Sequence, residues 1–87
     1  MADETITAIQ GSQPTVAGLR IGIMDAATFD GVSKARLLLR PPGQDIQVVL
    51  AVGETHDLTG VGSVTLVSVA ADDPQARPQV TLRVVSD

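Results

Sequence analysis

The stretch AVGETHDLTGVG, residues 51–62, holds the only histidine of the chain, His56, with Glu54 two positions before it and Asp57 directly after it. An imidazole beside carboxylates can move protons, or can contribute to a metal site. In an extended chain Glu54 and His56 point to one side and Asp57 to the other, whereas a turn could gather all three. The stretch therefore predicts either a site or a corner between two strands.

A corner is the simpler interpretation of this stretch. Gly53 and Gly60 bracket it, and Leu58 is its one apolar anchor. A catalytic zinc site needs three protein ligands, and the sequence offers neither a second histidine nor a cysteine. We therefore expect no metal and no cofactor at His56, with Glu54, His56 and Asp57 kept as candidate ligand-binding residues.

Other chemical motifs are incomplete. The run GVGSVT, residues 60–65, begins like a dinucleotide-binding turn but lacks the third glycine and leads into a strand. Ser63 does not lie in a G-x-S-x-G elbow. The sequence thus predicts no catalytic residue and does not favour an enzyme; the least favoured function class is an enzyme that uses His56 with Glu54 and Asp57. Two acidic pairs lack the alternating carboxylates of a calcium loop and are interpreted as solvated turns: Asp25 with Asp30, and Asp72 with Asp73.

Composition sets the fold class. The 87 residues predict one domain, 1–87, and twelve Val, five Ile and eight Thr favour strands over helices. The absence of cysteine excludes a disulfide framework. Phe29 is the sole aromatic residue, so we expect an aliphatic core and no platform for stacking bases or sugars. A net charge of −4 argues against nucleic acid as a partner.

No targeting or membrane segment is predicted. The start MADETITAIQ lacks a basic region followed by an apolar one, and no run approaches the roughly 18 apolar residues of a membrane span. The expected location is the cytoplasm. The bias toward Ala, Gly, Val, Arg and Pro is typical of a bacterial genome rich in G and C.

The apolar pattern predicts an all-β fold, a small antiparallel six-stranded sandwich or partly open barrel. Short loops rich in Gly, Pro and Asp separate the strands, as in antiparallel hairpins. Residues 25–31 are expected to form a loop with one helical turn at most, and Gly18 and Gly22 indicate a bulge or bend. The alternative is a helix over 26–39. The six predicted strands are 5–9, 15–24, 32–40, 46–52, 64–70 and 80–85.

Two predicted strands are apolar on both faces. Val48 and Leu50 alternate with Val49 and Ala51 in one of them, and 64–70 is similar. Such strands need a cover on the outer face, which a second copy, a protein partner or a small ligand in a cavity could provide. Alternatively, the sheet curls into a compact barrel that buries both faces. The first function class is accordingly an interaction or structural module that forms a homo-oligomer or an accessory subunit. The second is a binder of a small apolar ligand, with a pocket mouth formed by Arg20, Arg36 or Arg83.

The runs TVAGLRIGI, LAVGETHDLTGVGSVTLVSV and VTLRVV, with the basic and aliphatic strand between them, resemble a small uncharacterised all-β domain family of actinobacterial type. In that family a strand ending in V-x-x-G-[DE] leads through a short polar corner to another strand. The resemblance implies that VGETHDL is such a strand-corner-strand feature. It carries no known activity and no site residues.

Overall fold

The computed structural model describes residues 2–41, 43–71 and 77–86. These residues form eight antiparallel strands and no helix, which confirms the all-β prediction. Accordingly, the part of the chain that the structure describes contains no helix able to cross a membrane. The strands are β1 (Ala2–Ile9), β2 (Thr15–Val16), β3 (Leu19–Phe29), β4 (Val32–Arg40), β5 (Ile46–Ala51), β6 (Thr55–Leu58), β7 (Gly62–Ala70) and β8 (Gln79–Ser86).

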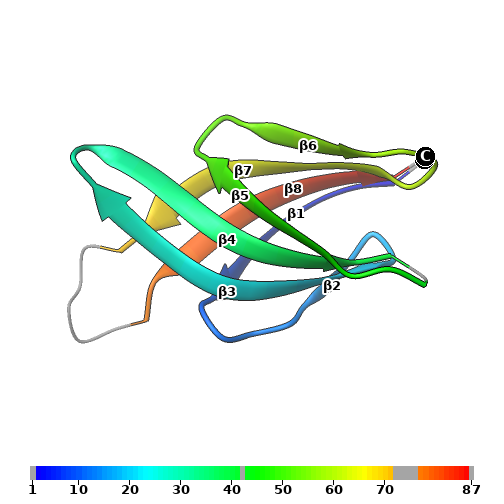
Figure 1. Ribbon diagram of the computed structural model, residues 1–87, viewed down its shortest axis with the longest axis horizontal. Coiled ribbons are helices and arrows are strands. Elements are labelled where there is room, and N and C mark those ends of the chain that lie inside the picture. Colours follow the sequence, from blue (N-terminus) through cyan, green and yellow to red (C-terminus); the bar gives the residue numbers. More distant parts are fainter. Residues whose placement is uncertain (1, 42, 72–76, 87) are drawn as a thin grey trace.

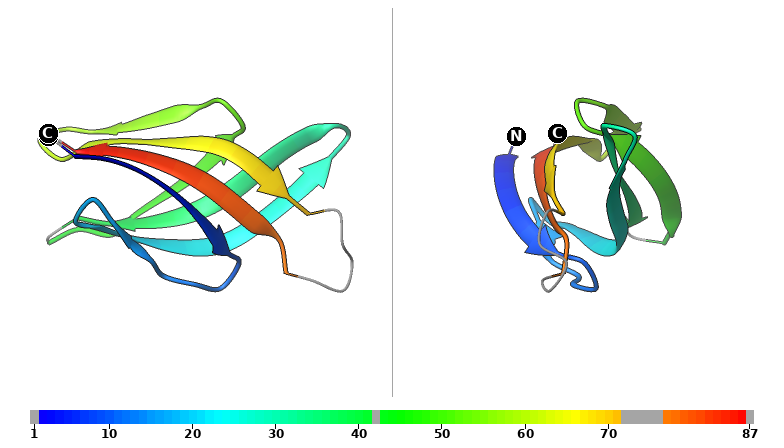
Figure 2. Two further views of the ribbon diagram at one scale, coloured as in Figure 1. Left: turned by 180° about the vertical axis from the view of Figure 1, so that it is seen from behind. Right: turned by 90° about the vertical axis from the view of Figure 1, so that its left-hand side faces the viewer.

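The strands form two four-stranded sheets that face each other (Figure 1). Sheet A has the order β1-β8-β7-β6, and sheet B has the order β2-β3-β4-β5. The chain crosses between the sheets after β1 and again after β5, and every other described connection joins neighbours in a sheet. Seen end-on, the strands surround a common interior, but the two sheets do not close into a barrel (Figure 2).

The core is aliphatic, as the sequence predicts. Alternate residues of each strand face inward, and the buried positions of the two sheets pack against each other. The described residues include no buried polar or charged side chain, so apolar burial holds the sheets together. The largest side chains of this core are fully buried: Ile21, Ile23, Leu37, Leu39, Leu66, Leu82, Val16, Val64 and Val80.

One β-bulge in each sheet changes which side chains face outward. In β3 the register shifts between Ile23 and Asp25, so that Ala26 takes the next inward position. In β7 the shift lies between Leu66 and Ser68, and the extra residue is Val67. The bulge in β7 explains why this strand looks apolar on both faces in the sequence.

Two tight hairpins have turns that demand positive φ. The β2–β3 turn has Ala17 at 50° and Gly18 at 81°, and the β3–β4 turn has Asp30 at 52° and Gly31 at 78°. Positive φ at both central residues is the type I′ geometry, whose twist matches that of the flanking strands. Asp-Gly is a favoured pair for this turn, so the second hairpin follows directly from its sequence.

The six-strand prediction is wrong within the described residues, for two reasons. The predicted strand 15–24 is broken at Ala17 by a type I′ turn, and Thr55–Leu58 of the predicted corner is itself a strand. Residues 25–29 continue β3 instead of forming a loop, and the helix over 26–39 is absent. The bulge lies at Met24, whereas Gly18 belongs to a turn and Gly22 to a regular part of β3.

Candidate functional site

Glu54 has a structural role at the β5–β6 corner. The Ala51 N–H donates to its carboxylate at 2.7 Å, and the Glu54 N–H donates to the Ala51 carbonyl at 2.9 Å. Gly53 has a φ of 92° at the third position of this turn, as type II geometry requires. Glu54 thus closes the corner by satisfying a backbone donor at the end of β5.

His56 and Asp57 lie on opposite faces of β6. His56 is half-buried and shares its face with the buried Leu58, whereas Asp57 is exposed. In register, His56 is opposite Val64 and Asp57 is opposite Ser63. His56 borders a hollow of about 370 Å³ between the β4–β5 turn and β6.

The structure therefore does not bring Glu54, His56 and Asp57 together. The strand alternation separates the last two, and the first is committed to the corner. Within residues 2–41, 43–71 and 77–86, no three His, Cys, Asp or Glu side chains cluster as metal ligands would. The acidic pair Asp72 and Asp73 lies outside the described residues.

The three candidate arginines lie at separate places. Arg83, on the outer face of sheet A, forms a bidentate pair with Asp3, with donor–acceptor distances of 3.0 and 2.6 Å. These hydrogen bonds lower the pKa of the Asp3 carboxyl and raise the pKa of Arg83. Arg36, on sheet B, is 3.9 Å from Asp25, and Arg20 lies near the start of β3.

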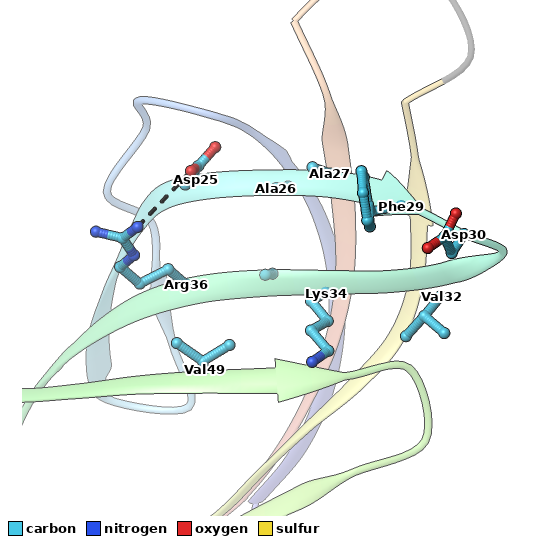
Figure 3. A pocket seen from close by; sticks show the side chains of 10 residues that line it. Asp25, Ala26, Ala27, Phe29, Asp30, Val32, Lys34, Arg36 and Val49 are labelled. Carbon is cyan, nitrogen blue, oxygen red and sulfur yellow. Dashed lines mark ion pairs between the residues drawn. The ribbon is translucent and has the colours of Figure 1, made fainter.

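Sheet B carries a hollow of about 510 Å³ on its outer face near the tip of the β3–β4 hairpin (Figure 3). Its lining combines exposed apolar side chains with charges of both signs. We call this surface the hairpin face; it is formed by Asp25, Phe29, Asp30, Val32, Lys34, Arg36 and Val49.

Apolar exposure is high on the hairpin face. The exposed fraction is 78% for Phe29, 48% for Val32 and 58% for Val49. Phe29 and Val32 are opposite each other beside the turn. The bulge in β3 puts Phe29 here: without the extra residue, the alternation begun by Leu19 and Ile21 would direct Phe29 inward.

Lys34 lies at the centre of the hairpin face. Its cross-strand neighbours are Ala27 on β3 and Ala51 on β5, so small side chains flank it on both sides. It extends over β5, whereas Asp30 lies at the hairpin tip (Figure 3). No carboxylate of the described residues lies within 4.0 Å of its ammonium group. The arrangement suits binding of a surface that is apolar and also carries charge.

Of the sequence candidates, Arg36 alone belongs to the hairpin face. Sequence reasoning missed Phe29 because it placed residues 25–31 in a loop. Val32 and Lys34 lie in the predicted strand 32–40, but no binding role was assigned to them. Two signals were available: Phe29 is the sole aromatic residue, and Asp30-Gly31 is a favoured hairpin turn. Together they predict an exposed aromatic side chain beside a hairpin tip.

No protein family matches the chain. Likewise, no curated protein and no solved structure matches it.

Proposed function

We propose that this protein is a small self-associating interaction module, in which the hairpin face of one copy binds the hairpin face of a second copy. The observation that carries the proposal is the exposed apolar group of Phe29, Val32 and Val49. Large apolar side chains gathered on one surface are characteristic of binding surfaces, because leaving them in water costs free energy. Aromatic residues in particular contribute much of the binding energy at interfaces.

Charge complementarity supports a second copy as the partner. The chain as a whole has a net charge of −4, which disfavours contact between most parts of two copies. The hairpin face is locally neutral, since Asp25 and Asp30 balance Lys34 and Arg36. A dimer with two-fold symmetry needs a self-complementary surface, and the proposed dimer pairs Asp30 of each copy with Lys34 of the other.

Sedimentation velocity over a wide concentration range tests this proposal. We expect a concentration-dependent dimer in the wild type and at least a tenfold higher dissociation constant for Phe29→Thr, since one buried aromatic side chain contributes more than about 1.4 kcal/mol at an interface centre. Val49→Thr should weaken the dimer less. A wild-type protein that stays monomeric at millimolar concentration would overturn self-association.

Val67 provides the matched control for Val49. It is a valine of similar exposure, 43% against 58%, but it lies in sheet A at the bulge of β7. Val67→Thr should leave the dimer unchanged. Equal weakening by Val67→Thr and Val49→Thr would place the contact elsewhere.

The charge pairing has its own test. Asp30→Asn keeps a residue that tolerates positive φ in the turn, and Lys34→Gln keeps a long side chain. Each change alone should weaken the dimer, and the double variant should weaken it by less than the sum of the two. Fully additive effects would show that Asp30 and Lys34 do not interact across the interface.

A second candidate function uses the same hollow to bind a small apolar ligand. Its volume of about 510 Å³ lies within the range of ligand pockets. A dye that fluoresces in apolar surroundings distinguishes the two functions. Saturable dye binding by a monomeric wild type, lost in Phe29→Thr, would favour the ligand binder over the dimer.

A further inference from the structure

A row of polar side chains crosses the outer face of sheet B at the end opposite the hairpin tip. Thr15 on β2 is directly opposite Arg20 on β3, and Arg20 is directly opposite Arg40 on β4. Asp45 lies beyond Arg40, with its Oδ1 3.7 Å from the Arg40 Nε. Leu19, Ile21 and Leu39 are buried, so the arginines between them face outward.

The register places two arginine residues side by side on this face. Like charges in direct cross-strand register destabilise a sheet, so this arrangement calls for a compensating negative charge. Among the described residues, Arg20 has no carboxylate within 4.0 Å. Asp45 directly precedes β5, which lies on the side of β4 away from β3 and Arg20.

Asp45 compensates the charge of Arg40 only through a long contact. Its Oδ1 lies 3.7 Å from the Arg40 Nε, and among the described residues this Nε has no hydrogen-bond acceptor. The Nε atom is itself buried, whereas the Arg40 side chain as a whole is 37% exposed, so an external anion would contact the terminal guanidinium nitrogens. An anion between Arg20 and Arg40 would supply the missing negative charge.

We propose that Arg20 and Arg40 bind a phosphate group. Guanidinium groups donate paired hydrogen bonds in a planar fork that matches the oxygens of phosphate. The Thr15 hydroxyl is a third donor beside Arg20.

This phosphate site is independent of the proposed dimer. The two surfaces lie at opposite ends of β3 and β4, and none of Thr15, Arg20 or Arg40 belongs to the hairpin face (Figure 1). The net charge of −4 makes general attraction of anions an inadequate explanation for binding. Saturable binding would therefore report on the local arrangement of the two arginines.

The test is an NMR titration with inorganic phosphate, which follows the Nε–H signals of the arginines at constant ionic strength. We expect saturable shifts for Arg20 and Arg40 and none for Arg83. Arg40→Gln should raise the dissociation constant at least tenfold. Arg40→Lys should also weaken binding, because lysine keeps the charge but loses the planar fork.

Arg83→Gln is the matched control, since Arg83 is an exposed arginine of a β-strand that already has a carboxylate partner. It should leave phosphate binding unchanged. Equal shifts with chloride, or equal weakening by Arg83→Gln and Arg40→Gln, would overturn the phosphate site. A parallel titration with glycerol phosphate identifies the source: tighter binding than phosphate indicates an organic phosphate ester, and equal binding indicates the free anion.

Discussion

The outer faces of the two sheets differ in how their polar groups are satisfied. On sheet A, neighbouring strands satisfy one another through side-chain pairs. These pairs are Thr7 with Thr81 at 3.0 Å, Thr55 with Thr65 at 2.7 Å, and Asp3 with Arg83 at 2.6 Å.

On sheet B the outer groups are left open. Phe29 and Val49 are exposed. In the described part of the chain, Lys34 has no carboxylate within 4.0 Å and the buried Nε of Arg40 has no hydrogen-bond acceptor. The ion pairs here are long, at 3.9 Å for Asp25 with Arg36 and 3.7 Å for Arg40 with Asp45.

Under the two proposals above, the difference would separate stability from binding. Both sheets contribute inward aliphatic residues to the same core, so the outer faces are free to differ. On sheet A the polar side chains of the outer face pair with one another. On sheet B the outer face carries exposed apolar side chains and charged groups without close partners, which the proposed second copy and the proposed anion would contact. The predictions below test this division, from the largest expected effect to the smallest.

Gly62→Ala should destabilise the protein most. A Cβ at Gly62 would overlap the Val85 carbonyl oxygen and lie 2.8 Å from the Ser86 Cα, and its φ is 148°. Because these are backbone atoms held within sheet A, we expect a loss of about 3 kcal/mol or more, the upper range for overpacking. The measurement is urea unfolding.

Gly22→Ala in sheet B is the control for Gly62→Ala. A Cβ at Gly22 would be 3.5 Å from the Leu38 Cβ, an ordinary contact. It should change the free energy of unfolding by less than about 1 kcal/mol. Similar losses of unfolding free energy in the two variants would show that the backbone around Gly62 is packed no more closely than the backbone around Gly22.

Glu54→Ala should cost about 1 kcal/mol of unfolding free energy, since it leaves the Ala51 N–H without its acceptor. Glu54→Gln, which keeps an acceptor oxygen, should recover part of the loss. Asp57→Ala, an exposed change on β6, is the control and should have little effect. If the Glu54→Ala protein is as stable as the wild type, Glu54 has no structural role at the corner.

Asp3→Asn should reduce stability slightly at neutral pH, and the reduction should vanish in acid. The Arg83 pair lowers the pKa of Asp3 in the folded protein, so the wild type gains stability above the ordinary carboxyl pKa of about 4 and loses it as the pH falls through the lowered value. Urea unfolding of both proteins from pH 7 to pH 2 measures this. A difference that grows as the pH falls would contradict it.

Asp25→Asn is the sheet B comparison for Asp3→Asn. The contact of Asp25 with Arg36 is longer than that of Asp3 with Arg83, at 3.9 Å against 2.6 Å. We expect a smaller loss of stability at neutral pH, because long exposed ion pairs contribute little.

Phe29→Thr should leave the stability of the monomer unchanged within about 0.5 kcal/mol, because Phe29 is 78% exposed and outside the core. The measurement is urea unfolding at a protein concentration at which the proposed dimer is dissociated. A large loss would mean that Phe29 packs within its own chain, and the contrast between the two faces would then disappear.

Several features of the fold could be predicted from the sequence. The alternation of Leu19, Ile21 and Ile23, of Ala35, Leu37 and Leu39, and of Val80, Leu82 and Val84 predicts inward faces, and the structure buries all nine. Pro41 and Gly43 predict a turn after the strand 32–40. This turn is confirmed, since the Gln44 N–H donates to the Pro41 carbonyl at 3.1 Å and Gly43 has a φ of 80°. Strand alternation and turn residues are local signals, so they can be recognised from residues that are close together in the sequence.

The candidate site could be predicted only in small part. Arg36 is the one sequence candidate on the hairpin face, and the charged cluster around His56 divides between a corner and two faces of β6. The prediction failed at residues 25–31 because Asp25 interrupts the apolar alternation, which favours a loop over a bulged strand.

By itself the sequence determines an all-β chain with an aliphatic core, because β-branched residues, alternation and turn residues act over a few neighbours. Only the tertiary structure decides where the bulges of β3 and β7 lie, because a bulge depends on which residue of the neighbouring strand is opposite. The tertiary structure also decides that Arg20 is opposite Arg40 in the strand register and that Phe29 faces outward. Those placements come from the register between strands, which is set by packing the whole core and not by any single stretch of residues.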